Sequence, residues 1–353
     1  MTDSFDYDLL VELTETSGVP GYEDRIRALV RAELEPAVDR LQSDSMGNLV
    51  GTLESETETD YDVVVAAHID EIGFMVKHID EDGFLELDAL GGWDPRILRA
   101  QRVTVHTDDG EDLPGVIGSV PPHTLTDEQR EAEPKVEDVR VDLGLDSEAV
   151  TERVSVGDLV TMAGRTERVG EFVSGKSLDN RASVLAMIET ARRLEAPDVN
   201  VHFAATTQEE VGLRGAATLG VDLDPDLVFA LDTTVANDVA GFEPGKQVTR
   251  LGEGAAIKLK DSSVITNHKL HRRLRSIAEA RDIEHQLEVL PAGGTDTGSL
   301  QRAGGATPAG AISVPTRYLH TPTECVHEAD LEAVIYLLVA ALDTEDGTHD
   351  YAL

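Results

Sequence analysis

Runs of consecutive apolar residues recur along the chain and indicate buried strands. A strand that is apolar throughout is expected where a parallel sheet is covered on both faces. Such runs predict strands over residues 63–67, 201–205, 228–231 and 311–314. A shorter strand is expected over residues 49–53, where it follows a turn rich in Asp, Ser, Gly and Asn.

Apolar residues at helical spacing predict helices before, between and after these strands. The predicted helices cover residues 7–16, residues 26–34, the segment that follows Arg181, and residues 329–342. The combination of buried strands with amphipathic helices indicates an α/β fold with a mostly parallel sheet.

The pattern changes between residues 72 and 164, where short alternating segments are separated by turns. The segments cover residues 73–77, 84–87, 102–106, 115–119, 136–141 and 158–162. We expect them to form a small β-barrel inserted into the α/β domain. Residues 1–71 and 165–353 would then form one discontinuous domain, and residues 72–164 the inserted barrel.

Length and composition fit a large core with a smaller domain beside it. The chain has 353 residues, 41% of them apolar, and no run approaches the roughly 20 apolar residues that a membrane span needs. The first residues lack the basic and then apolar pattern of a signal peptide. Its single cysteine, Cys325, excludes an internal disulfide. We therefore expect a cytoplasmic protein without a membrane partner.

The chain is strongly acidic, with 30 basic and 68 acidic residues and a net charge of −38. Nucleic acids and anionic membranes are therefore poor partners. Self-repulsion of this charge destabilises the compact state, and molar salt relieves it by screening. Lysine is also scarce, with seven residues against 23 arginines. We interpret the surface as adapted to a high-salt cytoplasm; an ordinarily acidic protein is the alternative.

Histidines and carboxylates follow the predicted strands. In open α/β sheets, ligand sites form outside the carboxyl ends of the strands. His68, Glu210, Asp232 and His320 lie in such positions, and Asp179 lies in a loop that can reach the same edge. Two histidines and three carboxylates suit a pair of divalent ions such as zinc, cobalt or manganese, if one carboxylate bridges. Glu209 is then left as the general base.

Each of these residues has a plainer interpretation when it is taken alone. The pair Glu209–Glu210 could be two surface acids on a turn, His68 a structural histidine, and Asp179 the N-cap of the next helix. Asp70 follows His68 by two residues and could accept the imidazole N–H, which would fix the tautomer of a ligating histidine. It is the combination of these positions that favours a metal site.

Five segments in this order resemble one enzyme family, the TET-type dinuclear metallo-aminopeptidases. Members are known as glutamyl or deblocking aminopeptidases, and some have been labelled cellulases; the acidic composition is similar to that of a haloarchaeal member. The resemblance is carried by residues 67–73 (AHIDEIG), 178–181 (LDNR), 208–212 (QEEVG), 230–232 (ALD) and 317–322 (RYLHTP). It extends over nearly the whole chain, including the insertion.

The resemblance implies a function and a role for each site residue. Asp179 would bridge two ions, His68 and Asp232 would complete one site, and Glu210 and His320 the other. Glu209 would be the general base, and Asp70 the partner of His68. The expected substrates are peptides with a free N-terminus, from which one residue is removed. These roles follow from the resemblance to the family alone.

The resemblance also implies an architecture. The expected fold is a zinc-peptidase-like catalytic domain with a PDZ-like inserted barrel that serves dimerisation, and dimers would assemble into a tetrahedral dodecamer. The small-residue turn at residues 293–296 lacks the Lys-Ser/Thr ending of a phosphate-binding loop, and the resemblance makes it a wall of the substrate pocket.

Two other functions remain open at this point. One is a metal-binding scaffold without turnover. A scaffold of this kind would be expected to have lost the general base, but Glu209 is present. The other is glycoside hydrolysis, which needs a carboxylate pair and usually no pair of metal ions.

Overall fold

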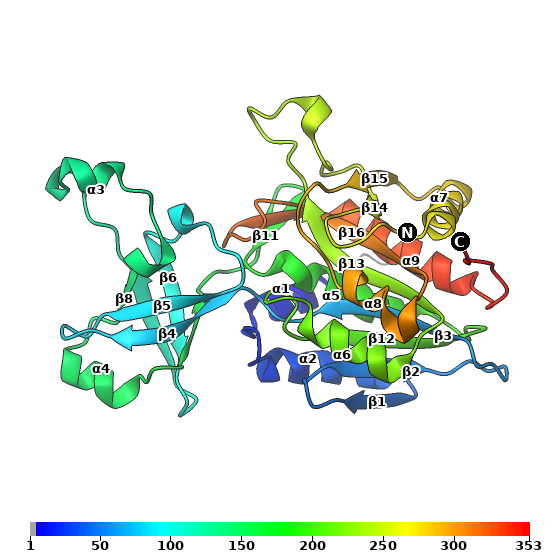
Figure 1. Cartoon of the computed structure of the whole chain (residues 1–353), viewed down its shortest axis with the longest axis horizontal. Helices are drawn as coiled ribbons and strands as arrows, with labels where there is room; N and C mark the ends of the chain where they lie inside the picture. The colour runs from blue at the N-terminus through cyan, green and yellow to red at the C-terminus, as the bar shows by residue number, and fades with distance from the viewer. Residues whose placement is uncertain (1–4) are drawn as a thin grey trace.

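A computed structural model describes residues 5–353 of the chain. Its main sheet has eleven strands (Figure 1). In spatial order these are β1 (Arg40–Ser43), β2 (Leu49–Leu53), β12 (Asn200–Thr206), β3 (Asp62–His68), β13 (Leu227–Val235), β16 (Ala309–Arg317), β17 (Glu324–His327), β11 (Phe172–Gly175) and β10 (Glu167–Val169), with β14 (Ala255–Lys260) and β15 (His285–Val289) beside β16. The mixed α/β class predicted from the sequence is confirmed.

The sheet is mixed, so the prediction of a mostly parallel sheet was wrong. Only the central strands β12, β3, β13 and β16, and the outlying pair β14–β15, are parallel. The flanking pairs β1–β2, β2–β12, β16–β17, β17–β11 and β11–β10 are antiparallel. Short links, such as residues 44–48 between β1 and β2, can join only antiparallel neighbours, because a parallel crossover needs a dozen or more residues.

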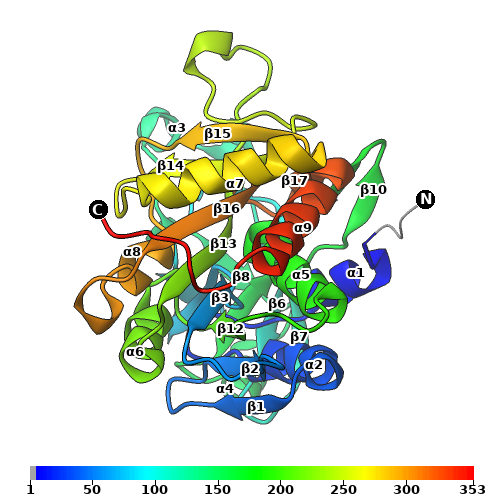
Figure 2. The same ribbon diagram turned by 90° about the vertical axis from the view of Figure 1, so that its right-hand side faces the viewer.

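Both faces of the central strands are covered, which explains their uninterrupted apolar sequence. Val63 and Val65 of β3 lie in the larger core with helices on one face, and Val64 lies in a smaller core on the other. The first face carries α1 (Tyr7–Glu15), α2 (Asp24–Leu34), α5 (Leu178–Arg193), α7 (His268–Arg281) and α9 (Glu328–Asp343), and the second carries α6 (Arg214–Leu223) and α8 (Thr297–Leu300) (Figure 2).

Residues between β3 and β10 form a closed barrel at one side of the molecule (Figure 1). Its strands are β4 (Gly73–Ile79), β5 (Leu85–Leu90), β6 (Gln101–His106), β7 (Asp112–Ile117), β8 (Arg140–Asp142) and β9 (Leu159–Met162), and it carries the short helices α3 (Asp127–Glu131) and α4 (Ser147–Arg153). The barrel has a core of its own, centred on residues such as Phe74, Val105 and Val160. The predicted barrel is therefore present. The strand predicted over residues 136–141 begins instead with a 3-10 turn, Val136–Asp138.

Among the described residues, no helix combines the length and the apolar character that crossing a bilayer requires.

Candidate metal centre

The central parallel strands end at one edge of the sheet, and this edge carries the predicted residues. His68 is the last residue of β3, and Glu209 and Glu210 lie on the turn after β12. His320 follows β16. Because these strands run in the same direction, their carboxyl ends meet, and residues distant in sequence become neighbours.

Asp232 lies inside β13, not beyond its end as the sequence suggested. The strand continues to Val235 because it stays paired with β16 over its whole length, from Val228 to Val235. Its pairing with β3 stops earlier, at Ala230. Asp232 therefore lies where the edge of β13 toward β3 becomes free, next to His68.

Asp179 lies between two imidazoles. Its Oδ1 is 3.4 Å from His68 Nε2, and its Oδ2 is 3.6 Å from His320 Nε2. The remaining carboxylates complete two groups: His68 Nε2 is 3.8 Å from Asp232 Oδ1, and His320 Nε2 is 3.8 Å from Glu210 Oε1. The five side chains are thus brought together, and Asp179 belongs to both groups. Glu209 also lies within the spacing of metal ligands, in a further group with His68 and Glu210.

The interatomic distances suit metal ligation. Zinc–nitrogen and zinc–oxygen bonds of about 2.0–2.1 Å in tetrahedral geometry place two ligand atoms about 3.3 Å apart. The observed separations of 3.4 to 3.8 Å are close to this value. In addition, Asp179 Oδ1 is buried without a hydrogen-bond donor, so a cation would satisfy an acceptor that the protein leaves unpaired.

Asp179 is not a helix cap, although it lies at the start of α5. Its backbone angles are non-helical, with φ −79° and ψ 103°, and those of Asn180 are non-helical too. Its backbone N–H donates to Glu324 Oε2 at 3.0 Å. The Asp179 carboxylate is therefore free to face the imidazoles.

Asp70 orders the site through two different parts of the residue. His68 Nδ1 is 3.1 Å from the Asp70 main-chain carbonyl oxygen, and the Asp70 carboxylate is farther away at 3.5 Å. That carboxylate accepts the backbone N–H groups of Glu209 and Glu210, each at 3.0 Å. Its closest contacts thus hold the Glu209–Glu210 turn, whereas the sequence led us to expect only a contact with the imidazole.

Two residues that the sequence did not single out position His320. The Gly92 carbonyl oxygen, in the loop after β5 of the barrel, is 2.7 Å from His320 Nδ1. Glu324 accepts the His320 backbone N–H at 2.8 Å through Oε1, while Oε2 holds Asp179. With Nδ1 engaged by a carbonyl, Nε2 of His320 faces the carboxylates, as it does in His68. No sequence motif links Gly92 to residue 320, so only the fold could identify it.

In the absence of a bound cation, several groups of the cluster have raised pKa values. Burial lowers the pKa of His320, but Asp179 and Glu210 outweigh it and raise this pKa to about 10. Burial, together with the nearby Asp179, raises the pKa of Glu210 to about 8. Burial also raises the pKa of Glu209 well above its ordinary value. Divalent cations would relieve the mutual repulsion of these carboxylates, which is the usual reason for such a grouping.

Behind this cluster lies a further buried acid, Asp296, which sequence reasoning had assigned only to a pocket wall. Burial raises its pKa to about 7. Thr206 donates a hydrogen bond to its Oδ2 at 2.5 Å, and its Oδ1 has no donor. Its place in the small-residue turn at residues 293–296 was the only signal in the sequence.

The cluster opens into a cavity of about 760 Å³. Its other walls come from the turn after β12, the end of β13, residues 290–295, Leu319, and Gly92 to Asp94 of the barrel. This volume lies in the usual range for ligand pockets. A substrate in this cavity would therefore lie directly against the two histidines.

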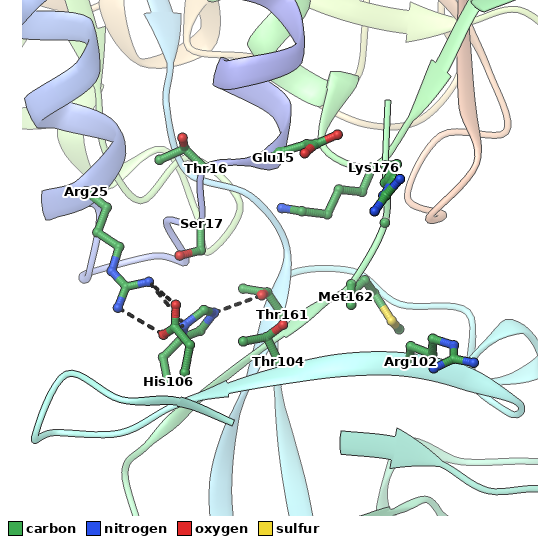
Figure 3. Close-up of a pocket in the computed structure, with 14 residues that line it drawn as sticks. Glu15, Thr16, Ser17, Arg25, Arg102, Thr104, His106, Thr161, Met162 and Lys176 are labelled. Carbon is green, nitrogen blue, oxygen red and sulfur yellow. Dashed lines mark hydrogen bonds and ion pairs between the residues drawn. The ribbon is translucent and has the colours of Figure 1, made fainter. Parts of the chain in front are cut away.

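A second cavity, of about 600 Å³, lies between the barrel and the ends of α1 and α2 (Figure 3). Asp112 of the barrel connects the two sides of this junction. It accepts two hydrogen bonds from Arg25 of α2, at 2.8 and 2.9 Å, and contacts His106 Nδ1 of the barrel at 2.7 Å. His106 Nε2 is 2.9 Å from Thr161 Oγ1 (Figure 3). These charged groups already satisfy each other, and no metal-ligand group among the described residues lies here.

One more acidic group, near the C-terminus, has the spacing of metal ligands: Glu345, Asp346 and His349. Its members have structural partners instead, because Glu345 accepts hydrogen bonds from Arg273 and from Tyr351. Asp346 accepts from Thr348.

The chain matches the family model of the M42 glutamyl aminopeptidases over residues 47–337. It is 37% identical over 340 residues to a putative aminopeptidase, FrvX, of Escherichia coli K12, with 96% of this chain and 95% of the relative covered. Identity is 34% to a lysyl aminopeptidase of Pyrococcus furiosus and 32% to a glutamyl aminopeptidase of Lactococcus lactis, each with 96% of this chain and 97% of the relative covered.

Solved structures agree with these relatives. An aminopeptidase from the archaeon Desulfurococcus kamchatkensis superposes with a TM-score of 0.92 at 36% identity, covering 96% of this chain and 94% of its own. The TET1 peptidase of Pyrococcus horikoshii, which can assemble into a tetrahedron or a large octahedral shell, gives a TM-score of 0.85 at 34% identity, with 96% and 99% covered.

Proposed function

The chain belongs to the M42 glutamyl aminopeptidase family, and we propose that it is a metal-dependent aminopeptidase that uses two divalent ions and Glu209 as general base. The observation that carries this proposal is the position of Asp179, whose two carboxylate oxygens face the imidazoles of His68 and His320 at 3.4 and 3.6 Å. A carboxylate in this position can contact two cations at once. Zinc or cobalt suits the mixed nitrogen and oxygen ligands best, and manganese is a further option.

The ligands divide into two sets around Asp179. His68 and Asp232 would hold one ion, and Glu210 and His320 would hold the other. When bound, such a pair of ions polarises the scissile carbonyl and lowers the pKa of a water molecule. Asp70, Gly92 and Glu324 hold the ligands in place, because each accepts hydrogen bonds from a ligand residue or its turn.

Glu209 is the general base, which transfers the proton of the attacking water. Its Oε2 is 4.0 Å from His68 Nε2, so its carboxylate lies at the margin of the cluster and lines the cavity. From there it accepts a proton from the attacking water and returns it to the amine that leaves. The peptide substrate lies in the cavity with its free N-terminus against the carboxylates, which restricts cleavage to the first residue.

The proposal extends to domains and assembly. Residues 1–71 and 165–353 form the zinc-peptidase-like catalytic domain, and residues 72–164 form a PDZ-like domain that contributes to dimerisation. Dimers assemble into a tetrahedral dodecamer, as the tetrahedral assembly of the Pyrococcus horikoshii relative suggests. The acidic surface is adapted to a high-salt cytoplasm, in line with the net charge of −38.

Metal removal tests the function directly. Dialysis against a chelator should abolish hydrolysis of aminoacyl p-nitroanilides, and zinc or cobalt should restore it. A two-carboxylate glycosidase would keep its activity after chelation. A metal-binding scaffold would show bound metal but no turnover with any ion, and either result would contradict the proposal.

Elemental analysis tests the bridging role of Asp179. Asp179→Ala should bind less of both ions, whereas His320→Ala and Asp232→Asn should each lose one ion of the pair. Two ions still bound per chain in Asp179→Ala would refute the bridging assignment.

A further inference from the structure

The part of the main cavity beyond the metal cluster has an unusual composition for so charged a protein. Among the residues that the structure describes, its walls contain no lysine, arginine or histidine apart from the cluster itself. They are formed largely by apolar side chains and small residues, with threonine hydroxyls between them. The apolar side chains come from different segments of the chain: Trp93, Leu213, Val235, Leu290, Ala292 and Leu319.

The single charged residue among these walls is already neutralised. Asp94 receives hydrogen bonds from Arg96 Nε, 2.9 Å from each carboxylate oxygen, and a further one from Nη2 at 2.5 Å. Its pKa is lowered to about 2, mainly by this contact with Arg96. Asp94 and Arg96 thus pair with each other at an exposed part of the cavity wall, where their side chains are 37% and 78% exposed, and the pair adds no net charge there.

Two cations close to the cavity, Lys258 and Arg317, are also unavailable to pair with a substrate. Lys258 lies on β14 close to Asp232, but it is fully buried, and its Nζ is 2.5 Å from Glu288 and 3.5 Å from Asp261. Arg317, the last residue of β16 and two residues before Leu319, is paired with Asp238 at 2.7 and 2.8 Å. Among the described residues, no lysine or arginine thus lines this cavity. Arg214 and Lys260 lie next to the wall residues Leu213 and Leu290, but neither side chain is part of the walls.

We propose that this cavity selects peptides whose N-terminal side chain is uncharged and apolar, and that it rejects N-terminal glutamate. The inference rests on the proposed function and names its substrate class. A glutamate side chain would be buried without a counter-ion and close to several carboxylates, which is unfavourable. A leucine side chain would instead cover Val235, Leu290 and Leu319 with apolar surface. For lysine, the walls beyond the metal cluster offer only Asp94, which is paired with Arg96, and the cluster carboxylates are assigned to the metal ions and to the N-terminal amine, so lysine is also disfavoured relative to leucine.

This preference separates the chain from two of its relatives. A glutamyl aminopeptidase and a lysyl aminopeptidase are among the proteins that it resembles, at 32% and 34% identity. Specificity therefore follows from the wall residues of this chain, and the family description alone does not assign it.

The test compares kcat/KM for leucyl, alanyl, lysyl and glutamyl p-nitroanilides under one set of salt and metal conditions. We expect leucine to exceed glutamate by at least about 100-fold, and to exceed alanine by more than about ten-fold, since a hydrophobic pocket discriminates about 10- to 200-fold per methylene. Glutamate within ten-fold of leucine, or lysine above leucine, would overturn the proposal while leaving the aminopeptidase function intact. No turnover of any substrate would refute the function and the preference together.

A charge placed in the wall should reverse the preference. Leu290→Arg supplies the missing cation, and we expect the ratio of glutamyl to leucyl kcat/KM to rise by about ten-fold or more. Leu287→Arg is the matched control, because Leu287 lies on strand β15, which ends one residue before Leu290, is 40% exposed and does not line the cavity. An equal change in both variants would show that bulk charge, not the wall, controls the preference.

Binding can be measured without turnover if Leu290→Arg proves unstable. Calorimetric titration of metal-loaded Glu209→Gln with Leu-Ala-Ala and Glu-Ala-Ala should show tighter binding of the leucyl peptide. Equal affinities would overturn the proposal.

Discussion

The carboxylate of Asp70 accepts the backbone N–H of Glu209 at 3.0 Å, so a residue just after β3 fixes the turn that carries the general base. The same carboxylate accepts the N–H of Glu210 at 3.0 Å. One side chain therefore aligns both adjacent glutamates, one assigned to a metal and one to proton transfer. Adjacent residues need such a support because their side chains diverge.

Asp70→Asn should disturb both roles. An amide can replace only one of the two accepting oxygens, and its NH2 group opposes the second peptide N–H. Loss of such supporting contacts typically costs 10- to 100-fold in metal affinity or activity. Asp80→Asn is the control, because Asp80 Oδ1 also accepts two backbone N–H groups, at 3.0 and 2.9 Å, but in the barrel. Equal metal affinity in Asp70→Asn and wild type, measured by calorimetry, would contradict this role.

Glu209→Gln and Glu210→Gln should differ in their response to metal. Glu209→Gln removes the proton acceptor, and we expect kcat to fall by about 10²- to 10⁴-fold with both ions still bound. Glu210→Gln weakens a ligand, so raised metal concentration should restore part of its activity. Steady-state kinetics across a metal titration distinguishes the two. A similar metal response in both variants would invalidate the division of roles.

Metal binding should release protons, and apparent affinity should rise with pH. In the metal-free protein the pKa of Glu210 is raised to about 8 and that of His320 to about 10, so both groups are protonated at neutral pH. Ligation requires the ionised carboxylate and the neutral imidazole, so deprotonation favours binding. Calorimetry in buffers of different ionisation enthalpy measures the release, and Glu210→Gln should release fewer protons. An affinity unchanged between about pH 6.5 and about pH 8.5 would contradict this linkage.

Two ion pairs near the junction of the barrel and the main sheet should differ greatly in their effect on stability. Lys176 Nζ is 2.5 Å from Glu71 Oε2, with only 7% and 3% of the two side chains exposed. Lys176→Met would remove the cation that contacts the buried Glu71 carboxylate, leaving only the more distant Arg181, and should cost about 3–5 kcal/mol. Arg25 and Asp112 are 47% and 45% exposed, so Arg25→Met should cost less than about 1 kcal/mol.

Urea unfolding in molar potassium chloride, followed by circular dichroism, compares these two variants. The expected order is a large fall in the unfolding midpoint for Lys176→Met and a small one for Arg25→Met. If the exposed pair proved the more costly, burial would not be the controlling factor.

Molar salt should be required for activity and assembly, because the net charge of −38 repels itself at low ionic strength. Dialysis to about 50 mM salt, where screening extends over more than 10 Å, should dissociate the assembly. Light scattering and activity assays follow both properties. An unchanged and active particle at low salt would mean that the acidic surface is not a halophilic adaptation.

The sequence alone predicted the elements with a strong local pattern. The apolar run at residues 63–67 and the helical stripe at residues 329–342 correspond to β3 and α9, and the alternating insertion corresponds to the barrel. Helix α7 went unnoticed because only Leu270, Leu274 and Ala278 are buried in an otherwise polar segment. The antiparallel flanks of the sheet were also missed, since strand direction depends on partners that a local pattern does not contain.

For the site, the sequence supplied the candidates and the tertiary structure decided their relations. His68, Asp179 and His320 could be named from motifs, because residue type and position after a strand are local properties. That the two oxygens of Asp179 face the two imidazoles depends on α5 packing across the sheet, in which β13 separates β3 from β16. The contacts of Gly92 with His320, and of the Asp70 carboxylate with the Glu209 N–H, arise between segments far apart in the chain. Such contacts are products of packing, which only the folded molecule specifies.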